Sequence, residues 1–330
     1  MRERMKRSAW IVAVGLLWGC GQREPAINPN RITLAVIPKG TTHEFWKSIH
    51  AGAVQAAREA DVDIIWKGPL KEDDREGQVA VVEDMTRRGV KGIVLAPLDD
   101  AALQAPVAAA KKAGVPVVII DSGLKGKDFA SFVATDNEKG GRLAGAQLAR
   151  LLHGKGKVLM LRYQEGSAST AQRERGFLAE IKRHRGIKVV SANQYGGATT
   201  ESAYRASENL LAPYKKDGRL TIQGIFCPNE STTFGMLRAL QDGGLAGSVR
   251  FVGFDSSAKL VEGLRAGLLD GLVLQNPVKM GYLGVKTMVA HLKHKKVPAR
   301  VDTGVQLVTK ANMDEPAVQA VLTPDLSILK

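Results

Sequence analysis

The chain has 330 residues, of which 44% are apolar and 24% charged, as in a soluble globular protein of one large or two medium domains. Its net charge of +14 is compatible with binding to nucleic acid or to an anionic membrane. The basic residues are scattered, however, in short runs such as 180–188 and 291–300 that end predicted helices. No helix-turn-helix, zinc-finger or RNA-binding motif occurs, so we expect no nucleic-acid partner.

The first twenty residues combine a basic start with an apolar run over Ala9–Trp18 and a cysteine at position 20. That run is too short to cross a bilayer, which takes about 20 apolar residues, and it predicts a secretory signal peptide over 1–19. Its end, "LWGC", resembles the lipobox of bacterial lipoproteins, although Trp18 is bulkier than the usual residue. The resemblance implies a lipid on Cys20 and a tether over 20–30. An ordinary signal peptide and a retained membrane anchor are the alternatives.

The second cysteine, Cys227, lies inside an apolar segment. If Cys20 is acylated, no intramolecular disulfide can form. A chain of this length needs no covalent staple even in an oxidising compartment. We therefore interpret Cys227 as a small buried hydrophobic residue.

From Arg31 onward, short apolar runs alternate with segments whose apolar residues recur at helical spacing. Such runs are typical of strands buried on both faces, and thus of a parallel sheet covered by helices. In the first half we expect strands at 32–38, 62–67, 91–97 and 115–121, and helices at 43–60, 73–88 and 99–113.

The alternation restarts after 129–137. Two successive sheets of similar size predict two doubly wound lobes with a cleft between them. Ligands of open α/β sheets bind beyond the carboxyl ends of the strands, so the residues just after each strand are the informative ones. In this half we expect strands at 157–162, 187–194, 220–227, 249–255 and 271–276, and helices at 138–152, 168–184, 200–213, 232–241 and 258–266.

The strand ends of both halves carry aromatic residues and polar groups that form paired hydrogen bonds. A sugar suits this set, because its C–H face lies against aromatic rings while its vicinal hydroxyls both donate and accept. Enclosure between two lobes would strengthen each of these bonds. The candidate ligand-binding residues are Lys39, His43, Phe45, Trp46, Asp121, Ser122, Arg173, Asn229, Asp255 and Gln275.

Each candidate also has a purely structural interpretation. Phe45 or Trp46 could pack a helix onto the sheet, and His43 could cap that helix. Asp255 could cap the helix after it, and Arg173 could be a surface charge. The shared location at strand ends in both lobes favours the binding interpretation.

From Arg31 to about Lys310 the sequence resembles the ribose-type (type I) periplasmic sugar-binding proteins of ABC transporters. The matching stretches include "HEFWKSIHAGAVQAA", "VATDNEKGGRLAGAQLA", "STAQRERGF" and "VRFVGFDSS". The resemblance implies an α/β fold of two doubly wound parallel-sheet lobes joined by a three-segment hinge. The first lobe would comprise 31–135 and 276–304, and the second 136–275 and 305–330. Thr135, Asp136 and Asn276 would lie in the hinge, with a third crossing near 304–306.

The family's ligand contacts carry over to this sequence with some departures, among them an aromatic contact that does not align with Tyr195. By position, Phe45 and Trp46 take the aromatic places, His43 replaces an asparagine, and the remaining polar contacts match Asp121, Arg173, Asn229, Asp255 and Gln275. Ser122 stands where ribose binders have arginine, and Lys39 where they have a small residue. The resemblance therefore implies a pentose or a hexose and does not single out ribose.

The favoured function is capture of a monosaccharide and its delivery to an ABC permease, by a protein expected to be a lipid-anchored monomer in the periplasm or at the cell surface. An enzyme is not expected, because no P-loop, GxSxG, CxxC or HxxxH motif occurs. We expect no cofactor and no metal. A sugar-responsive repressor would need a DNA-binding segment where residues 1–30 carry the signal. A sensory protein that presents a sugar to a membrane receptor remains the alternative function.

Overall fold

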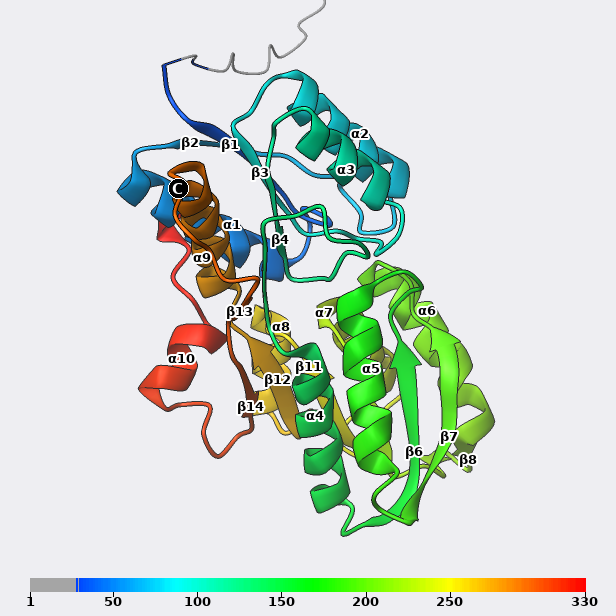
Figure 1. Cartoon of the computed structure of the whole chain (residues 1–330). Helices are drawn as coiled ribbons and strands as arrows, with labels where there is room; N and C mark the ends of the chain where they lie inside the picture. Colours follow the sequence, from blue (N-terminus) through cyan, green and yellow to red (C-terminus); the bar gives the residue numbers. More distant parts are fainter. Residues whose placement is uncertain (1–27, 29) are drawn as a thin grey trace, which may run out of the picture.

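The computed structural model describes residue 28 and residues 30–330, which form two lobes, each built on a six-stranded sheet (Figure 1). The predicted α/β class with parallel sheets in two lobes is confirmed. The predicted signal peptide at 1–19 and most of the tether, including Cys20, lie outside the described residues. Within the described part, no helix is long and apolar enough to cross a membrane.

The first lobe contains an all-parallel sheet in the strand order β13-β5-β4-β3-β1-β2. Its strands are β1 (Thr33–Ile37), β2 (Asp63–Trp66), β3 (Gly92–Leu95), β4 (Val117–Ile120), β5 (Ser131–Ala134) and β13 (Arg300–Asp302). The helices of this lobe are α1 (Glu44–Ala60), α2 (Arg75–Arg87), α3 (Gln104–Lys112) and α9 (Pro277–Leu292).

The second lobe has the strand order β14-β12-β11-β10-β6-β7, in which only β14 is antiparallel to its neighbour. Its strands are β6 (Lys155–Arg162), β7 (Gly186–Tyr195), β10 (Gly224–Phe226), β11 (Arg250–Phe254), β12 (Gly271–Gln275) and β14 (Val305–Val308), with a small hairpin of β8 (Lys215–Lys216) and β9 (Arg219–Leu220). The helices are α4 (Asn137–Leu151), α5 (Ala168–Ile181), α6 (Thr200–Leu211), α7 (Glu230–Asp242), α8 (Ala258–Arg265) and α10 (Pro316–Leu322).

Both sheets are buried on both faces, as the continuous apolar runs predict. In the first lobe, one face packs against α1 and α9 and the other against α2 and α3. In the second lobe, α4 and α5 cover one face while α6, α7 and α8 cover the other. Cys227 is fully buried in the core of the second lobe, as predicted. Burial raises the pKa of its thiol well above the usual value.

Three connecting segments join the lobes, at 135–136, at 276 and at 303–304. The first and third are bonded together: the Thr135 hydroxyl lies 3.2 Å from that of Thr303, and it donates to the carbonyl of Gly304. Asp136 and Asn276 cap α4 and α9 by accepting from backbone N–H groups. The first two crossings are thus fastened at the start of a helix in the lobe that the chain enters, whereas the third leads into β14.

The tail departs from its predicted assignment to the second lobe. Met313, Val318 and Leu322 are buried in the core of the second lobe, as expected for α10. A final turn, η2 (Ser327–Leu329), crosses back to α1, where Arg58 donates to the carbonyl of Ile328. The chain end therefore lies against both lobes.

The helix predicted at 99–113 begins only at Gln104. The Asp99 carboxylate accepts from the N–H groups of Ala101 and Ala102, and this local turn competes with helix formation. Arg75 also pairs with Asp99 at 2.8 Å, which fixes the turn against α2.

One close helix contact matters for the site. α4 and α5 approach so closely that a Cβ atom at Gly141 would lie 1.9 Å from the carbonyl oxygen of Arg173. Only glycine fits there. The approach brings Asn137, at the start of α4, beside the Arg173 side chain on α5.

Candidate functional site

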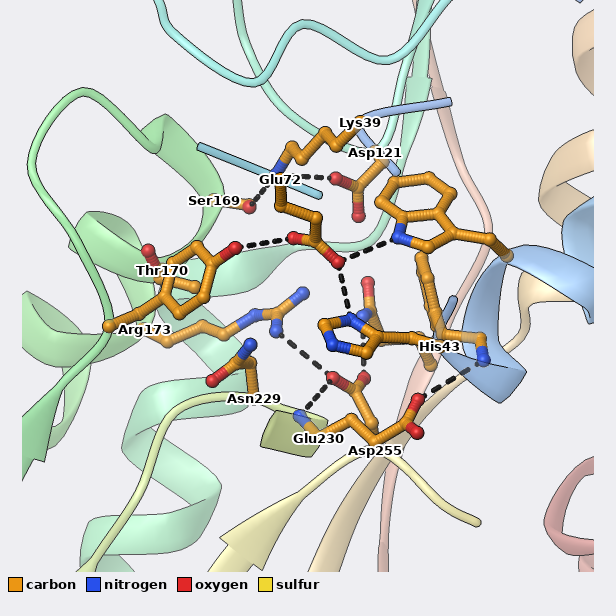
Figure 2. Close-up of a pocket in the computed structure, with 14 residues that line it drawn as sticks. Lys39, His43, Glu72, Asp121, Ser169, Thr170, Arg173, Asn229, Glu230 and Asp255 are labelled. Carbon is orange, nitrogen blue, oxygen red and sulfur yellow. Dashed lines mark hydrogen bonds and ion pairs between the residues drawn. The ribbon is translucent and has the colours of Figure 1, made fainter. Parts of the chain in front are cut away.

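A small enclosed cavity lies between the two lobes, at the carboxyl ends of their strands (Figure 2). Its volume is about 20 Å³, roughly the space of one water molecule. Both lobes contribute to its wall, which consists of Lys39, His43, Phe45, Trp46, Glu72, Asp121, Tyr163, Ser169, Thr170, Arg173, Asn229, Glu230, Asp255 and Gln275.

All the residues that the sequence nominated for ligand binding line this cavity except Ser122. Ser122 is fully buried beside it, and its hydroxyl accepts from the N–H of Ser169 on the other lobe. Ser122 therefore lies outside the wall in this arrangement, and its binding role stays a prediction. Its side chain is used in a contact between the lobes.

Each lobe contributes one aspartate directly after a central strand, Asp121 after β4 and Asp255 after β11. Both have positive φ, 60° and 65°, a conformation that aspartate tolerates better than most residues. The turn at each position aims the carboxylate back across the strand ends. Asp121 pairs with Lys39 at 2.8 Å, and both side chains are almost completely buried.

Arg173 is buried and is not a surface charge. Its Nε donates to Asn137 at 2.8 Å, its Nη1 donates to the carbonyl of Pro228, and its guanidinium lies over the ring of Phe254. Asp255 is 3.6 Å away. Burial raises the pKa of Asp255, and the charge of Arg173 opposes that shift. An arginine held so firmly can present its remaining donors in a fixed direction.

Gln275, at the end of β12, has one side-chain atom without a partner. Its amide nitrogen donates to Asp255 at 2.7 Å, which fixes the orientation of the amide. The carbonyl oxygen, Oε1, is buried and accepts no hydrogen bond. An unpartnered buried acceptor is costly, and in the wall of a cavity it indicates a donor supplied from outside the protein.

The observed contacts can be compared with the purely structural interpretations of Phe45, Trp46, His43 and Asp255. Phe45 and Trp46 belong to the core of the first lobe, as the structural interpretation has it, and they also line the cavity. His43 stands at the N-cap of α1 but makes no capping bond through its side chain. Asp255 accepts from the N–H of Glu230 on α7 and does not cap the helix after it.

Sequence reasoning missed five lining residues: Glu72, Tyr163, Ser169, Thr170 and Glu230. Tyr163 directly follows β6, so the rule that found the others applies to it as well. Ser169 and Thr170 lie in the first turn of α5, and Glu230 begins α7. Glu72 lies in the loop between β2 and α2, where no strand end indicates it.

Two glutamates join the lobes at helix N-termini. The carboxylate of Glu230 accepts from the N–H groups of Glu44 and Phe45, at the start of α1 in the other lobe. Glu44 in turn accepts from the N–H of Ala258, at the start of α8. Side-chain carboxyl oxygens thus accept from the free N–H groups of two helix N-termini and connect the lobes.

We expect a pH dependence of closure from Glu230. Burial raises its pKa from 4.5 to about 7, whereas opening returns the side chain to solvent. The closed arrangement therefore holds the proton of Glu230 more tightly than the open one. The resulting stabilisation of the closed arrangement is full below pH 4.5 and is lost as the pH rises through about 7. Affinity for a ligand that closes the lobes should fall over this window, by at most about tenfold per pH unit. Calorimetric titrations from about pH 5 to pH 8 measure it, and an equal slope in Glu230→Gln would refute the assignment.

The fold and the site together define the class of protein. Two lobes enclose a cavity of mixed donors, acceptors and aromatic rings, which is the arrangement of a binding protein that closes around a small ligand. No group of three metal-binding side chains occurs in the part of the chain that the structure describes.

Comparison with known proteins identifies the family. Residues 34–296 match the periplasmic binding protein domain, and the chain belongs to that family. The ribose import binding protein of Haemophilus influenzae is 29% identical over 84% of this chain and 91% of its own length. The D-ribose/D-allose-binding protein of Pseudomonas aeruginosa is 30% identical, with 92% and 99% covered. A solute-binding protein from Agrobacterium radiobacter in complex with D-arabinose superposes with a TM-score of 0.84 at 35% identity, covering 90% and 100%. The predicted resemblance is confirmed, and the family is one of transport binding proteins, not enzymes.

Proposed function

We propose that this protein captures a monosaccharide, a pentose or a hexose, between its two lobes and delivers it to an ABC importer. The relatives named for ribose, for ribose and allose, and for a bound arabinose support this class of ligand. The proposed contacts are the nominated residues without Ser122, supplemented by Ser169 and Thr170 of the wall.

The unpartnered Oε1 of Gln275 carries the proposal. It offers an acceptor for a sugar hydroxyl, while Arg173 offers donors and Phe45 and Trp46 offer rings for the C–H face. Hydroxyl groups are the ligand groups that satisfy donors and acceptors at once.

Entry of a sugar requires the lobes to part, because the enclosed cavity of about 20 Å³ is far smaller than a monosaccharide. We assign the hinge to the three connecting segments, with Thr135, Asp136 and Asn276 as the residues that absorb the rotation. Closure around the sugar is then a population shift towards an arrangement that an importer recognises.

A thermal-shift screen tests the proposed ligand class. We expect at least one of D-ribose, D-allose, D-arabinose, D-galactose and D-glucose to raise the melting temperature, because ligand binding to the folded state stabilises it by mass action. Isothermal titration should then give a Kd in the micromolar range or below. An amino acid serves as the negative control, and a panel without any shift would contradict the sugar assignment.

We further propose that Cys20 carries lipid and that residues 20–30 tether the lobes to a membrane face. The residues before the tether and the proline-bearing composition of the tether itself support this. In cells, Cys20→Ser should move the protein from the membrane fraction to the soluble fraction. The matched change Cys227→Ser should leave the distribution unaltered, and membrane association of Cys20→Ser would argue against lipidation.

A further inference from the structure

Glu72 occupies an unusual place beside the cavity. It lies in the loop between β2 and α2 and is 5% exposed. Its carboxylate accepts from the Trp46 indole at 2.7 Å and from the Tyr163 hydroxyl at 2.6 Å, and it pairs with Nδ1 of His43. These three donors occupy both oxygens. Glu72 is therefore poorly placed to bind a ligand directly, and its effect on the site must pass through its partners.

All three partners of Glu72 line the cavity, and His43 is the one with a second polar atom left for a ligand. Because Nδ1 is bonded to Glu72, the ring orientation is fixed and Nε2 is the nitrogen left for other contacts. Figure 2 shows the His43 ring between the carboxylates of Glu72 and Asp255. The ring is not used to cap α1, so the cavity is the place where its second nitrogen can act.

The charges around His43 favour the imidazolium. Burial alone would lower its pKa, but the charge and hydrogen bond of Glu72, with Glu230 and Asp255 from the other lobe, raise it to about 9. The pKa of Glu72 is lowered to about 2, against the effect of its burial, by His43 and by Lys39. In this state Nε2 is always a donor.

We propose that Glu72 is a positioning residue that holds His43 as a fixed hydrogen-bond donor to the sugar, and so selects a sugar oxygen that accepts at that point. This inference rests on the proposed function. Asparagine, the residue that the resemblance places here, can turn either an acceptor or a donor to a ligand. The pair of Glu72 and His43 removes that freedom.

The contacts of Glu72 fall into two groups, those within the first lobe and the one made to the second lobe. His43, Trp46 and Glu72 all belong to the first lobe, so their contacts persist when the lobes part. Tyr163 belongs to the second lobe, and its bond to Glu72 forms only on closure. The donor is therefore ready before the sugar arrives, and the buried carboxylate gains its last partner when the site closes.

The first test needs no sugar. In the protein without ligand, an NMR titration of the histidine ring protons should give His43 a pKa well above 6.5, and Glu72→Gln should lower it to about 6.5 or below. His43→Asn identifies the signal among the histidines. Glu174→Gln is the matched control, because it changes another buried carboxylate, which pairs with Arg162 and belongs to the other lobe. Equal His43 titrations in wild type and Glu72→Gln would overturn the proposal.

The second test separates positioning from a merely structural role. With the sugar that gives the largest thermal shift among D-ribose, D-allose and D-arabinose, Kd is measured for wild type and Glu72→Gln at about pH 6 and about pH 8.5. The Kd of Glu72→Gln divided by the Kd of wild type should be about tenfold or more larger at the higher pH than at the lower one, because only wild type still holds the His43 proton there. A constant ratio would overturn the proposal. Failure of wild type to bind any sugar would refute the proposed function, while the NMR result still decides the role of Glu72.

Tyr163→Phe provides a second test in case Glu72→Gln fails to fold. It removes only the bond made on closure, so the His43 titration without ligand should match wild type while sugar affinity falls several-fold. A shifted His43 titration in this variant would contradict the division between the lobes.

Discussion

Replacing Arg173 by alanine is expected to weaken sugar binding by about 100-fold or more, because hydrogen bonds from a charged donor contribute about 1.5–3 kcal/mol each. The same change removes the cation beside Asp255 and leaves the carbonyl of Pro228 and the amide oxygen of Asn137 without their donor. Loss of one member of a buried pair costs about 3–5 kcal/mol. We therefore expect the unfolding transition to shift to lower urea concentration as well.

Two further variants separate binding from stability. Arg173→Lys keeps a cation near Asp255 but lacks the fork, so it should recover part of the stability and little of the affinity. Arg175→Ala changes an exposed arginine on the same helix and should alter neither property. Titration calorimetry and urea denaturation measure the two effects. Binding by Arg173→Lys within twofold of wild type would refute the role of the fork.

The strand ends were predictable because of how parallel sheets are built. Continuous apolar runs locate β1, β4, β11 and β12, and the order of the strands brings their carboxyl ends to one edge. The residues that follow them, from Lys39 to Gln275, therefore meet without any knowledge of the loops. Tyr163 follows the same rule, and its position directly after β6 was sufficient to nominate it.

Glu72 could not be found in this way. It is separated from β2 by a loop, and its position depends on how that loop packs. The side chain of Gln78 donates to the carbonyls of Pro38 and Ala96 and ties the start of α2 to the first strands. Such contacts link residues that are distant in sequence, and no local pattern encodes them.

Ser122 shows a second limit of prediction from sequence, namely a residue at a strand end that does not line the cavity. Sequence places it next to Asp121, at the same strand end, yet its hydroxyl serves the contact with Ser169. Adjacent residues at a strand end point in different directions, so a position rule cannot tell a ligand contact from a contact between lobes. Likewise, the interaction of the chain end with α1 depends on a single turn after α10, which composition does not reveal.

The pair of Lys39 and Asp121 should be strongly coupled. Their side chains are 4% and 3% exposed, and Nζ lies 2.8 Å from the carboxylate. Lys39→Met leaves a buried carboxylate without its cation, and Asp121→Asn leaves a buried ammonium without its anion. Each single change should lower the free energy of unfolding by about 3–5 kcal/mol. Asparagine is the suitable replacement at 121, because it also tolerates the positive φ of that position.

The double variant Lys39→Met/Asp121→Asn should lose far less free energy of unfolding than the two single variants lose together, because it removes both buried charges at once. The exposed pair of Lys111 and Asp128, 2.9 Å apart in the same lobe, provides the matched cycle, and its coupling should not exceed about 1 kcal/mol. Urea denaturation of the wild type and the six variants gives both coupling energies. All three site variants should also lose sugar affinity, since Asp121 is a proposed acceptor and Lys39 additionally donates to Ser169 across the lobes. Additive effects at the buried pair would contradict the predicted coupling and would show that solvent or other groups compensate the two charges.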